Sequence, residues 1–220
     1  MRVLFVTNNS MSVIADQEQA LADIGIPAVG DVITSAQAAA SLVRHGERVL
    51  VCGGPGVVEA VGHGVGSVVD DPDHADVVIV GLHRDFDYDA LAAANRAIRR
   101  GARFIATNDD PSYPTPDGET PGAGSIVAAV ATASGVEPVV AGKPHQPMAD
   151  LAADRCGDDF SPDTVLMVGD RWTTDGLFAD VLDCPFALVR SGVTEPKAEA
   201  GGVAHIDEPD LAAVVSFLIG

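Results

Sequence analysis

Short apolar runs alternate along the chain with longer stretches in which apolar residues recur every three or four positions. The runs predict strands at 3–6, 49–52, 77–80, 104–106, 165–168 and 186–189. Most of them are apolar on both faces, which is typical of parallel strands covered by helices on both sides. Strand and helix alternate to the end of the chain, so the pattern predicts an α/β fold with a mostly parallel sheet.

Two of the helical stretches carry signals at their ends. The stretch at 91–98 runs into two arginines and Gly101, a cationic last turn with a glycine stop. Three aspartates at 85–89 precede it, and we expect them to place negative charge at its N-terminus. A second stripe, over 177–182, follows the threonines at 173–174, either of which could cap that helix.

The least regular segment is 107–123, which holds four prolines and two glycines. A loop of that length is uncommon inside a compact domain and is usually functional. We therefore expect a long functional loop here.

The charge balance makes some classes of protein improbable, namely those that bind nucleic acid or anionic lipid. Lys and Arg total 13 against 32 Asp and Glu, a formal net charge of −19. So acidic a surface repels nucleic acid and anionic lipid, and no apolar run is long enough to span a bilayer. A high-salt host and a GC-rich genome both remain open as reasons for this composition. Three widely spaced cysteines and a start without a signal peptide predict a cytoplasmic protein.

Three short motifs could carry chemistry. The first, Thr7-Asn8-Asn9-Ser10, follows an apolar run and lies where ligands of open α/β sheets collect, at the carboxyl end of a strand. Its hydroxyl, amide and backbone N–H groups could bind a phosphate oxygen. Alternatively, Ser10 or Ser12 caps the following helix.

The second motif is Gly142-Lys143-Pro144. Lysine occurs only twice in the chain, and this one stands between two conformationally special residues. Its ammonium could neutralise a phosphoryl group, although a solvated turn lysine is the commoner case.

The third motif is Gly169-Asp170-Arg171, at the end of the run 165–168, with Asp175 five residues after Asp170. A carboxylate at that position suits Mg²⁺, which takes one or two protein carboxylates and keeps several waters. Asp175, expected in the first turn of the next helix, could orient the waters of the metal or complement the helix dipole.

In order along the chain, these motifs resemble the haloacid dehalogenase-like superfamily, in particular its NagD-like or para-nitrophenyl phosphatase-like branch. Any one motif is weak evidence for the family, but the ordered set is strong evidence because it spans nearly the whole chain. The stretches that carry the resemblance are TNNS at 7–10, GLHRDFD at 81–87, NDDPSYPTPDGETPGAG at 108–124, GKP at 142–144, and GDR at 169–171 with Asp175.

The resemblance implies a Rossmann-like core, here 1–46 and 141–220, with an inserted α/β cap at 47–140. It implies Mg²⁺-dependent hydrolysis of small phosphomonoesters through an aspartyl-phosphate, and a possible homodimer through the cap. The substrate would be a sugar, glycerol, glycolate or nucleotide phosphate.

The resemblance also implies roles for single residues. Thr7, Asn8 and Asn9 would bind the phosphoryl group, with Thr7 and Lys143 acting in catalysis and Lys143 stabilising the phosphoryl charge. Asp170 would bind Mg²⁺, and Asp175 would support that metal site. The cap loop, represented by Asp109, Tyr113 and Asp117, would close over the leaving group and help to choose the substrate.

One departure from the family is serious. The family places its nucleophile and its acid/base residue in an Asp-x-Asp-Gly motif on the first core strand, upstream of the threonine motif, and this chain has no such motif. We therefore expect a truncated chain or a misassigned start codon, with the central strand between 3–6 and 165–168 missing. The alternative is a non-catalytic remnant that binds phosphate and Mg²⁺. A third hypothesis, a nucleotide-binding Rossmann protein, has less support, because the glycines at 62–66 follow a helical stretch instead of a strand.

Overall fold

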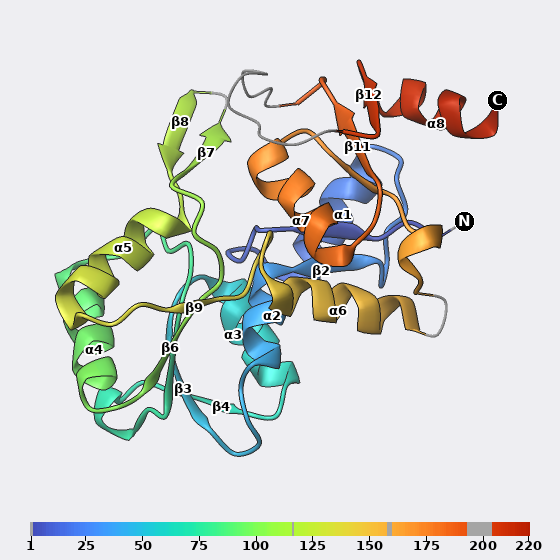
Figure 1. The fold of residues 1–220 in the computed structure, drawn as a ribbon. Helices are drawn as coiled ribbons and strands as arrows, with labels where there is room; N and C mark the ends of the chain where they lie inside the picture. Colours follow the sequence, from blue (N-terminus) through green and yellow to red (C-terminus); the bar gives the residue numbers. More distant parts are fainter. Residues whose placement is uncertain (1, 116, 158–159, 193–203) are drawn as a thin grey trace. The chain divides into compact units, whose positions relative to one another are not determined.

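The structure is a computed structural model that describes residues 2–115, 117–157, 160–192 and 204–220 (Figure 1). It divides into two compact units, 1–142 and 143–220. In both units parallel strands alternate with helices, so the predicted α/β fold is confirmed. No helix in the described part of the chain is long and apolar enough to cross a bilayer.

The first unit contains β1 (Phe5–Thr7), α1 (Ile14–Asp23), β2 (Val32–Thr34), α2 (Ser35–Ser41), β3 (Arg48–Cys52), α3 (Pro55–His63), β4 (Ser67–Val69), β5 (Val77–Val80), α4 (Tyr88–Arg99), β6 (Arg103–Ala106), β7 (Ser112–Thr115), β8 (Gly118–Pro121), α5 (Ala123–Ser134) and β9 (Val139–Val140). The second contains α6 (Gln146–Cys156), β10 (Met167–Gly169), α7 (Leu177–Leu182), β11 (Phe186–Val189), β12 (Ile206–Glu208) and α8 (Leu211–Ile219).

A five-stranded parallel sheet, in the order β4-β3-β5-β6-β9, forms the centre of the first unit. Figure 1 shows α4 and α5 on one side of it and α2 and α3 on the other. All four residues of β5 are fully buried, as expected for a strand that is apolar on both faces. This sheet is separate from the parallel pair β1-β2, a separation consistent with an inserted cap.

Helix α4 follows its sequence signals. The Asp87 carboxylate accepts a hydrogen bond from the Ala90 backbone N–H at 2.9 Å, which satisfies one of the free donors of the first turn. Arg96 and Arg99 lie in the last turn, and Gly101 follows with φ +106°, a conformation that favours glycine. The predicted charged N-terminus and glycine stop are confirmed.

The segment 107–123 is more regular than predicted. Strands β7 and β8 pair in an antiparallel hairpin, so the expectation of an irregular loop is wrong for 112–115 and 118–121. The Thr115 hydroxyl donates to the Gly118 carbonyl at 2.6 Å across the turn. Proline is tolerated in these strands because neither of them is an inner strand, which would need every N–H.

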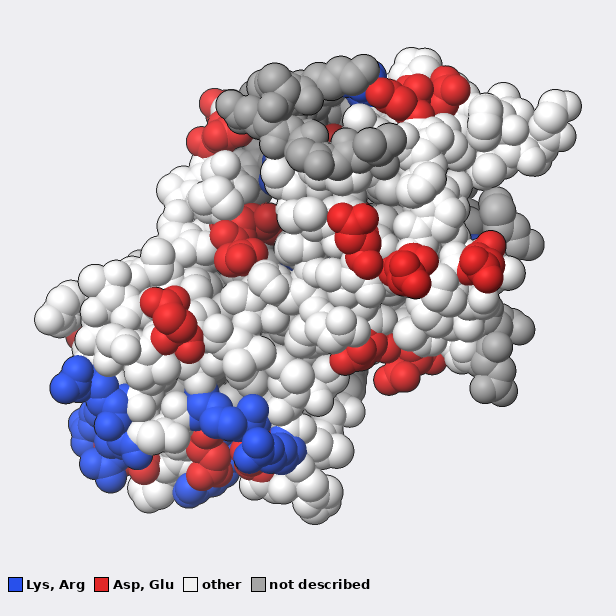
Figure 2. Space-filling view, viewed as in Figure 1, with Lys and Arg blue, Asp and Glu red and all other residues white. Residues whose placement is uncertain are grey.

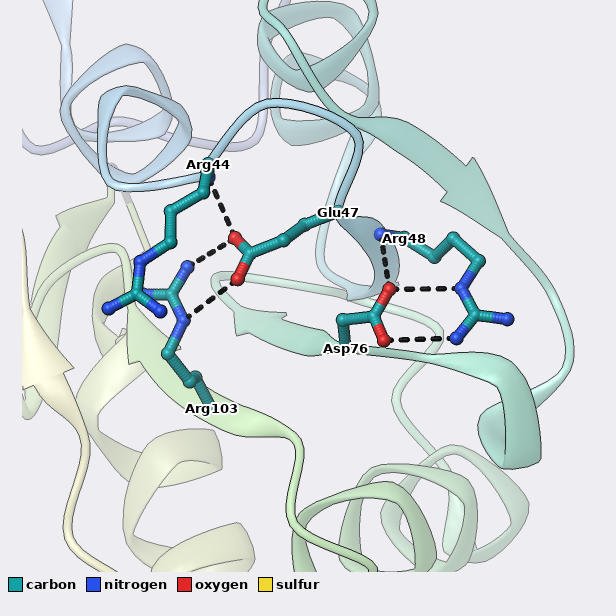
Figure 3. Close-up of polar contacts among 5 residues, drawn as sticks. All are labelled: Arg44, Glu47, Arg48, Asp76 and Arg103. Carbon is teal, nitrogen blue, oxygen red and sulfur yellow. Dashed lines mark hydrogen bonds and ion pairs between the residues drawn. The ribbon is translucent and has the colours of Figure 1, made fainter.

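Ion pairs join the N-terminal ends of the central strands, where arginine gathers on an otherwise acidic molecule (Figure 2). Arg48 at the start of β3 holds Asp76, the residue before β5, through two guanidinium–carboxylate contacts of 2.9 Å (Figure 3). The Arg103 guanidinium at the start of β6 pairs with the carboxylate of Glu47. The first pair connects the neighbouring strands β3 and β5, and the second connects β6 to the residue before β3, with β5 between them. Both pairs lie at the end of the sheet opposite the carboxyl termini of its strands.

The second unit is built on the parallel sheet β10-β11-β12. The Trp172 ring meets the Phe186 ring edge-to-face at a centroid distance of 5.4 Å, and Phe178 is fully buried. The prediction that a threonine at 173–174 caps α7 is wrong. Residues 172–176 instead form a π-helical turn in which the Arg171 carbonyl accepts the N–H groups of Asp175 and Gly176.

Candidate functional site

In the first unit, the predicted phosphate-binding residues lie in one loop at the carboxyl end of β1. The Thr7 Oγ1 accepts the backbone N–H of Asn9 at 3.0 Å, so its own hydroxyl proton can still be donated. The Asn9 side chain in turn accepts the backbone N–H of Met11 at 3.0 Å. The loop is therefore folded by its own short side chains.

Asn8 is fixed by segments far away in the sequence. Its carbonyl accepts the Ser35 hydroxyl at 2.8 Å, and its Nδ2 donates to Asp110 at 2.9 Å. The same Asp110 oxygen accepts from Asn108 at 2.8 Å. A Cβ at Gly142 would lie 2.6 Å from the Asn8 Oδ1, so only glycine lets the chain pass here without displacing that amide. Asp110 was not among the predicted site residues, because its contact with Asn8 spans 102 positions.

Ser10 and Ser12 do not cap α1. The N-cap position is Val13, with no side-chain cap hydrogen bond, so this alternative is wrong. Ser10 is fully buried and accepts a hydrogen bond from the Thr107 hydroxyl at 3.0 Å, which joins the β1 loop to the end of β6. The four-residue motif is thus a packed loop instead of a helix start.

In the second unit, Lys143 is not a solvated turn lysine. Its ammonium donates to the Asp175 Oδ1 at 2.7 Å, and the two side chains are only 11% and 8% exposed. The other oxygen, Oδ2, accepts the Arg171 backbone N–H at 3.3 Å. Since both of its oxygens are engaged within the protein, Asp175 holds Lys143 in place.

Asp170 lies in the loop directly after β10. The residue before it, Gly169, packs so closely against Asp175 that a Cβ there would lie 2.3 Å from the Oδ2 of that carboxylate. On the other side, a Cβ at Gly192 would lie 2.0 Å from the Asp170 Oδ2. Glycines therefore make room for both carboxylates of the third motif.

The donor set for a metal in this loop is a single carboxylate. No cluster of three His, Cys, Asp or Glu residues suited to a metal occurs among the described residues. Mg²⁺ needs only one or two protein carboxylates and keeps its waters, so Asp170 fits such an ion chemically. Asp175 fits less well, because Lys143 and Arg171 already use its oxygens.

The predicted cap-loop residues are spread along 109–117. Asp109 and Asp117 are exposed, whereas Tyr113 is half-buried on β7. The Tyr113 hydroxyl accepts a hydrogen bond from Arg84 at 2.9 Å. Interactions with Thr120 and Arg84 lower the pKa of the Tyr113 phenol. Tyr113 and Asp117 line one cavity together with residues that sequence reasoning did not assign to a site, among them His83, Arg84 and Phe86.

Family models match both ends of the chain. Residues 1–65 match the haloacid dehalogenase-like hydrolase family, and residues 140–215 match the HAD-hydrolase-like family. The three motifs with the proposed phosphate and metal residues all lie within these two ranges.

Curated relatives agree with the family models. The chain is 41% identical to the D-glycerol 3-phosphate phosphatase of Mycobacterium tuberculosis over 202 residues, which cover 87% of this chain but 55% of that protein. It is 36% identical to the acid sugar phosphatase of Staphylococcus saprophyticus, with 87% and 74% covered. It is 35% identical to a 5′-nucleotidase of Bacillus subtilis, with 87% and 75% covered. The chain thus spans little more than half the length of the first of these relatives.

Solved structures show the same fold. The p-nitrophenyl phosphatase of Archaeoglobus fulgidus superposes with a TM-score of 0.90 at 28% identity, covering 98% of this chain and 85% of that one. The glycerol phosphate phosphatase of M. tuberculosis in complex with magnesium gives 0.81 at 38% identity, covering 88% and 60%. The chain belongs to the haloacid dehalogenase-like hydrolases, in the p-nitrophenyl phosphatase or NagD-like branch.

Proposed function

We propose that the protein is a Mg²⁺-dependent phosphatase of small phosphomonoesters. The observation that carries the proposal is the buried Lys143–Asp175 ion pair beside the Asp170 loop. A lysine that has given up most of its hydration and is held by the Asp175 carboxylate is a positioned charge, the kind of group that stabilises a phosphoryl oxygen. The relatives named for glycerol phosphate, sugar phosphate and nucleotide support this substrate class.

Each residue in the proposal has a distinct part. Thr7, Asn8 and Asn9 bind the phosphoryl oxygens through hydroxyl, amide and backbone N–H groups, which add no charge. Lys143 balances the negative charge of the phosphoryl group, and Asp175 positions Lys143. Asp170 holds Mg²⁺, which when bound acts as a Lewis acid toward a phosphoryl oxygen.

The domain assignment is also a proposal. Residues 1–46 and 141–220 form the core and 47–140 the cap, with Asp109, Tyr113 and Asp117 on the substrate side of the cap. The separate five-stranded sheet of 48–140 supports this division. A homodimer through the cap and a cytoplasmic location remain predictions.

A second candidate function rests on one sequence observation. The 220 residues contain no Asp-x-Asp-Gly motif, which in the family supplies the nucleophile. A chain without that group would bind phosphate and Mg²⁺ but would not hydrolyse an ester, because phosphoryl transfer to the protein needs an in-line carboxylate.

The two candidates are separated by measuring binding and turnover with the same preparation. Calorimetry with inorganic phosphate and Mg²⁺ reports binding, and hydrolysis of para-nitrophenyl phosphate with Mg²⁺ reports turnover. For a phosphatase, Asp170→Asn should lower kcat/KM by about 100-fold or more, as loss of a transition-state charge stabiliser does. Asp180→Asn, an exposed carboxylate on α7, is the matched control and should change little.

Each outcome decides between the candidates. Turnover that depends on Asp170 supports the phosphatase. Phosphate binding that Lys143→Met abolishes, without turnover, supports the non-catalytic protein. Absence of phosphate binding, or turnover indifferent to Asp170→Asn, rules out the site as proposed.

A further inference from the structure

A second cavity, of about 300 Å³, lies in the first unit among α2, α3 and the start of α1. No residue assigned above to the phosphate, metal or cap-loop sites is among the described residues that line it. Its volume is at the lower end of the range of about 300–1,000 Å³ that is typical of small-molecule pockets. The cavity therefore has room for a small organic molecule that does not occupy the proposed phosphate site.

The walls of this cavity are fixed by the backbone around it. Thr34 and Gln37 form a capping box at the start of α2, in which each side chain accepts the backbone N–H of the other residue. At the start of α3, the Gly56 N–H donates to the Met11 carbonyl at 2.9 Å. A Cβ at Gly56 would lie 2.4 Å from the Ser12 carbonyl oxygen, so only glycine allows this approach. The cavity is thus formed before any ligand enters it.

Glu59 of α3 places a carboxylate in the wall. Its Oε2 accepts the Ile14 backbone N–H at 2.8 Å, whereas its Oε1 has no partner among the residues that the structure describes. None of the described lining residues is Lys or Arg. Because Glu59 is half-buried, a cation beside it would be screened less by solvent than one on the open surface. The wall therefore presents a negative charge with one oxygen available to a donor.

Ser41 of α2 supplies a second acceptor to the lining. Its hydroxyl donates to the Ala38 carbonyl at 2.8 Å, so the lone pairs of its oxygen remain available to accept a hydrogen bond. An ammonium group has three N–H donors and no acceptor. The polar part of the wall therefore suits an ammonium group.

The rest of the wall includes buried apolar residues. Ala40, Val43 and Ala60 line the cavity and are 7%, 5% and 8% exposed. Carbon atoms of a ligand gain free energy when they leave water for such a surface, but a bare inorganic cation has none to bury. The lining therefore favours an organic cation over a metal ion.

We infer that this cavity is a binding site for a small organic ammonium compound. The ammonium pairs with the Glu59 carboxylate, and the carbon atoms contact Ala40, Val43 and Ala60. A neutral molecule of the same shape leaves the Glu59 charge unpaired, and an anion is repelled by it. The inference does not depend on the proposed function, because its residues take no part in phosphate binding.

Three probes that share one ring separate the effect of charge from that of the apolar body. At neutral pH, benzylammonium is a cation, benzyl alcohol is neutral and benzoate is an anion. In titrations followed by NMR, we expect benzylammonium to bind at least about tenfold more tightly than either of the others. The Ile14 amide signal should shift on binding, because that N–H donates to Glu59.

Substitutions locate the site. Glu59→Gln keeps an oxygen for the Ile14 N–H but removes the charge, so it should weaken benzylammonium by about tenfold and leave benzyl alcohol unchanged. Ala60→Leu fills the cavity without touching the charge and should weaken both probes. Asp89→Asn removes an exposed carboxylate of α4 that does not line the cavity, and it should change neither.

Each outcome supports or overturns the inference. Absence of saturable benzylammonium binding, or equally tight binding of benzyl alcohol or benzoate, overturns it. Equal weakening by Glu59→Gln and Asp89→Asn also overturns it, since the attraction would then come from the overall charge of −19. Inorganic phosphate should bind equally well to the wild type and Glu59→Gln, so failure of this inference leaves the proposed function standing.

Discussion

The inner strands of the five-stranded sheet and the strands that precede the proposed site residues differ in how completely they are buried. Every side chain of β5 is fully buried, and it lies between β3 and β6. In contrast, all three residues of β1 and of β10 are only half-buried. Among the described residues, β1 pairs with β2 and β10 pairs with β11, each on one side only.

This difference separates the residues that supply stability from those that we propose to supply chemistry. The five-stranded sheet is held by apolar packing, which is non-directional and scales with buried area. The loops after β1 and β10 are held by specific polar contacts, such as Asn8 with Asp110 and Lys143 with Asp175. We therefore expect apolar truncations to matter most in the sheet, and polar substitutions to matter most in the loops.

The largest expected effect is the removal of a core aromatic ring. Phe104→Ala on β6 removes a side chain that is 4% exposed and should destabilise the protein by about 3–5 kcal/mol. The same change on β1, Phe5→Ala, should cost only about 1–2 kcal/mol because Phe5 is half-buried. Urea unfolding of the two variants measures the difference.

Phe217→Ala serves as the control, because this side chain of α8 is 63% exposed and should change stability by less than about 0.5 kcal/mol. Equal losses for Phe104→Ala and Phe5→Ala would show that the contrast in burial does not govern stability.

Breaking the buried ion pair should come next. Lys143→Met or Asp175→Leu alone leaves an uncompensated buried charge and should cost about 3 kcal/mol. The double variant should recover at least about 1 kcal/mol of the summed losses, because no charge is then stranded. A double-mutant cycle by urea unfolding gives this coupling energy.

The exposed pair Arg2–Asp31 is the matched comparison, with side chains 50% and 34% exposed. Arg2→Met should cost less than about 1 kcal/mol. If the Lys143–Asp175 cycle shows no more coupling than this surface pair, the ion pair does not fix Lys143.

The elements that could be predicted from the sequence are those whose side chains face apolar surroundings on both sides. The bounds of β5 and β11 match the predicted runs at 77–80 and 186–189. Strand β2 was missed, since its three residues carry too little periodicity to distinguish them from a loop. The β7-β8 hairpin was missed because its prolines argue against a strand unless both strands are edges.

The candidate site also has a part that could be predicted from the sequence and a part that could not. Thr7, Asn8 and Asp170 could be proposed as site residues from the sequence because they follow apolar runs, and ligands of α/β sheets bind at the carboxyl ends of strands. The contact of Asp175 with Lys143 was not predicted, because the two residues lie 32 positions apart and spacing does not show such a contact. Asp110 was missed for the same reason.

A methyl group at Gly142 tests how rigid the polar loop is. Gly142→Ala places a Cβ 2.6 Å from both the Asn8 Oδ1 and the Thr107 carbonyl, and should cost about 1–3 kcal/mol. Because the Asn8 amide must then shift, inorganic phosphate should also bind more weakly, as calorimetry would show. Gly62→Ala on α3 meets no atom within 4 Å and should instead stabilise the protein by about 0.5–1 kcal/mol. Unchanged phosphate binding in Gly142→Ala would exclude Asn8 from the phosphate site.

The smallest expected effect concerns the ion pairs at the end of the sheet (Figure 3). Hydrogen bonds from Arg48 lower the pKa of Asp76 from 3.8 to about 2. A carboxylate whose pKa is lowered by folding stabilises the protein above its unfolded pKa, and this contribution is lost as the pH falls from about 4 to about 2. Asp76→Asn should therefore destabilise the protein at pH 6 and have no effect at pH 2.

The loss at pH 6 should stay below about 1 kcal/mol, because both side chains are about 40% exposed or more and solvent screens the pair. Urea unfolding midpoints at the two pH values measure it. Asp16→Asn, which removes an exposed carboxylate on α1, should leave the wild-type pH dependence between these values in place. A loss in Asp76→Asn that is equal at pH 6 and pH 2 would mean that Asp76 acts through the shape of its side chain. The end of the sheet would then owe its stability to packing, as its interior does.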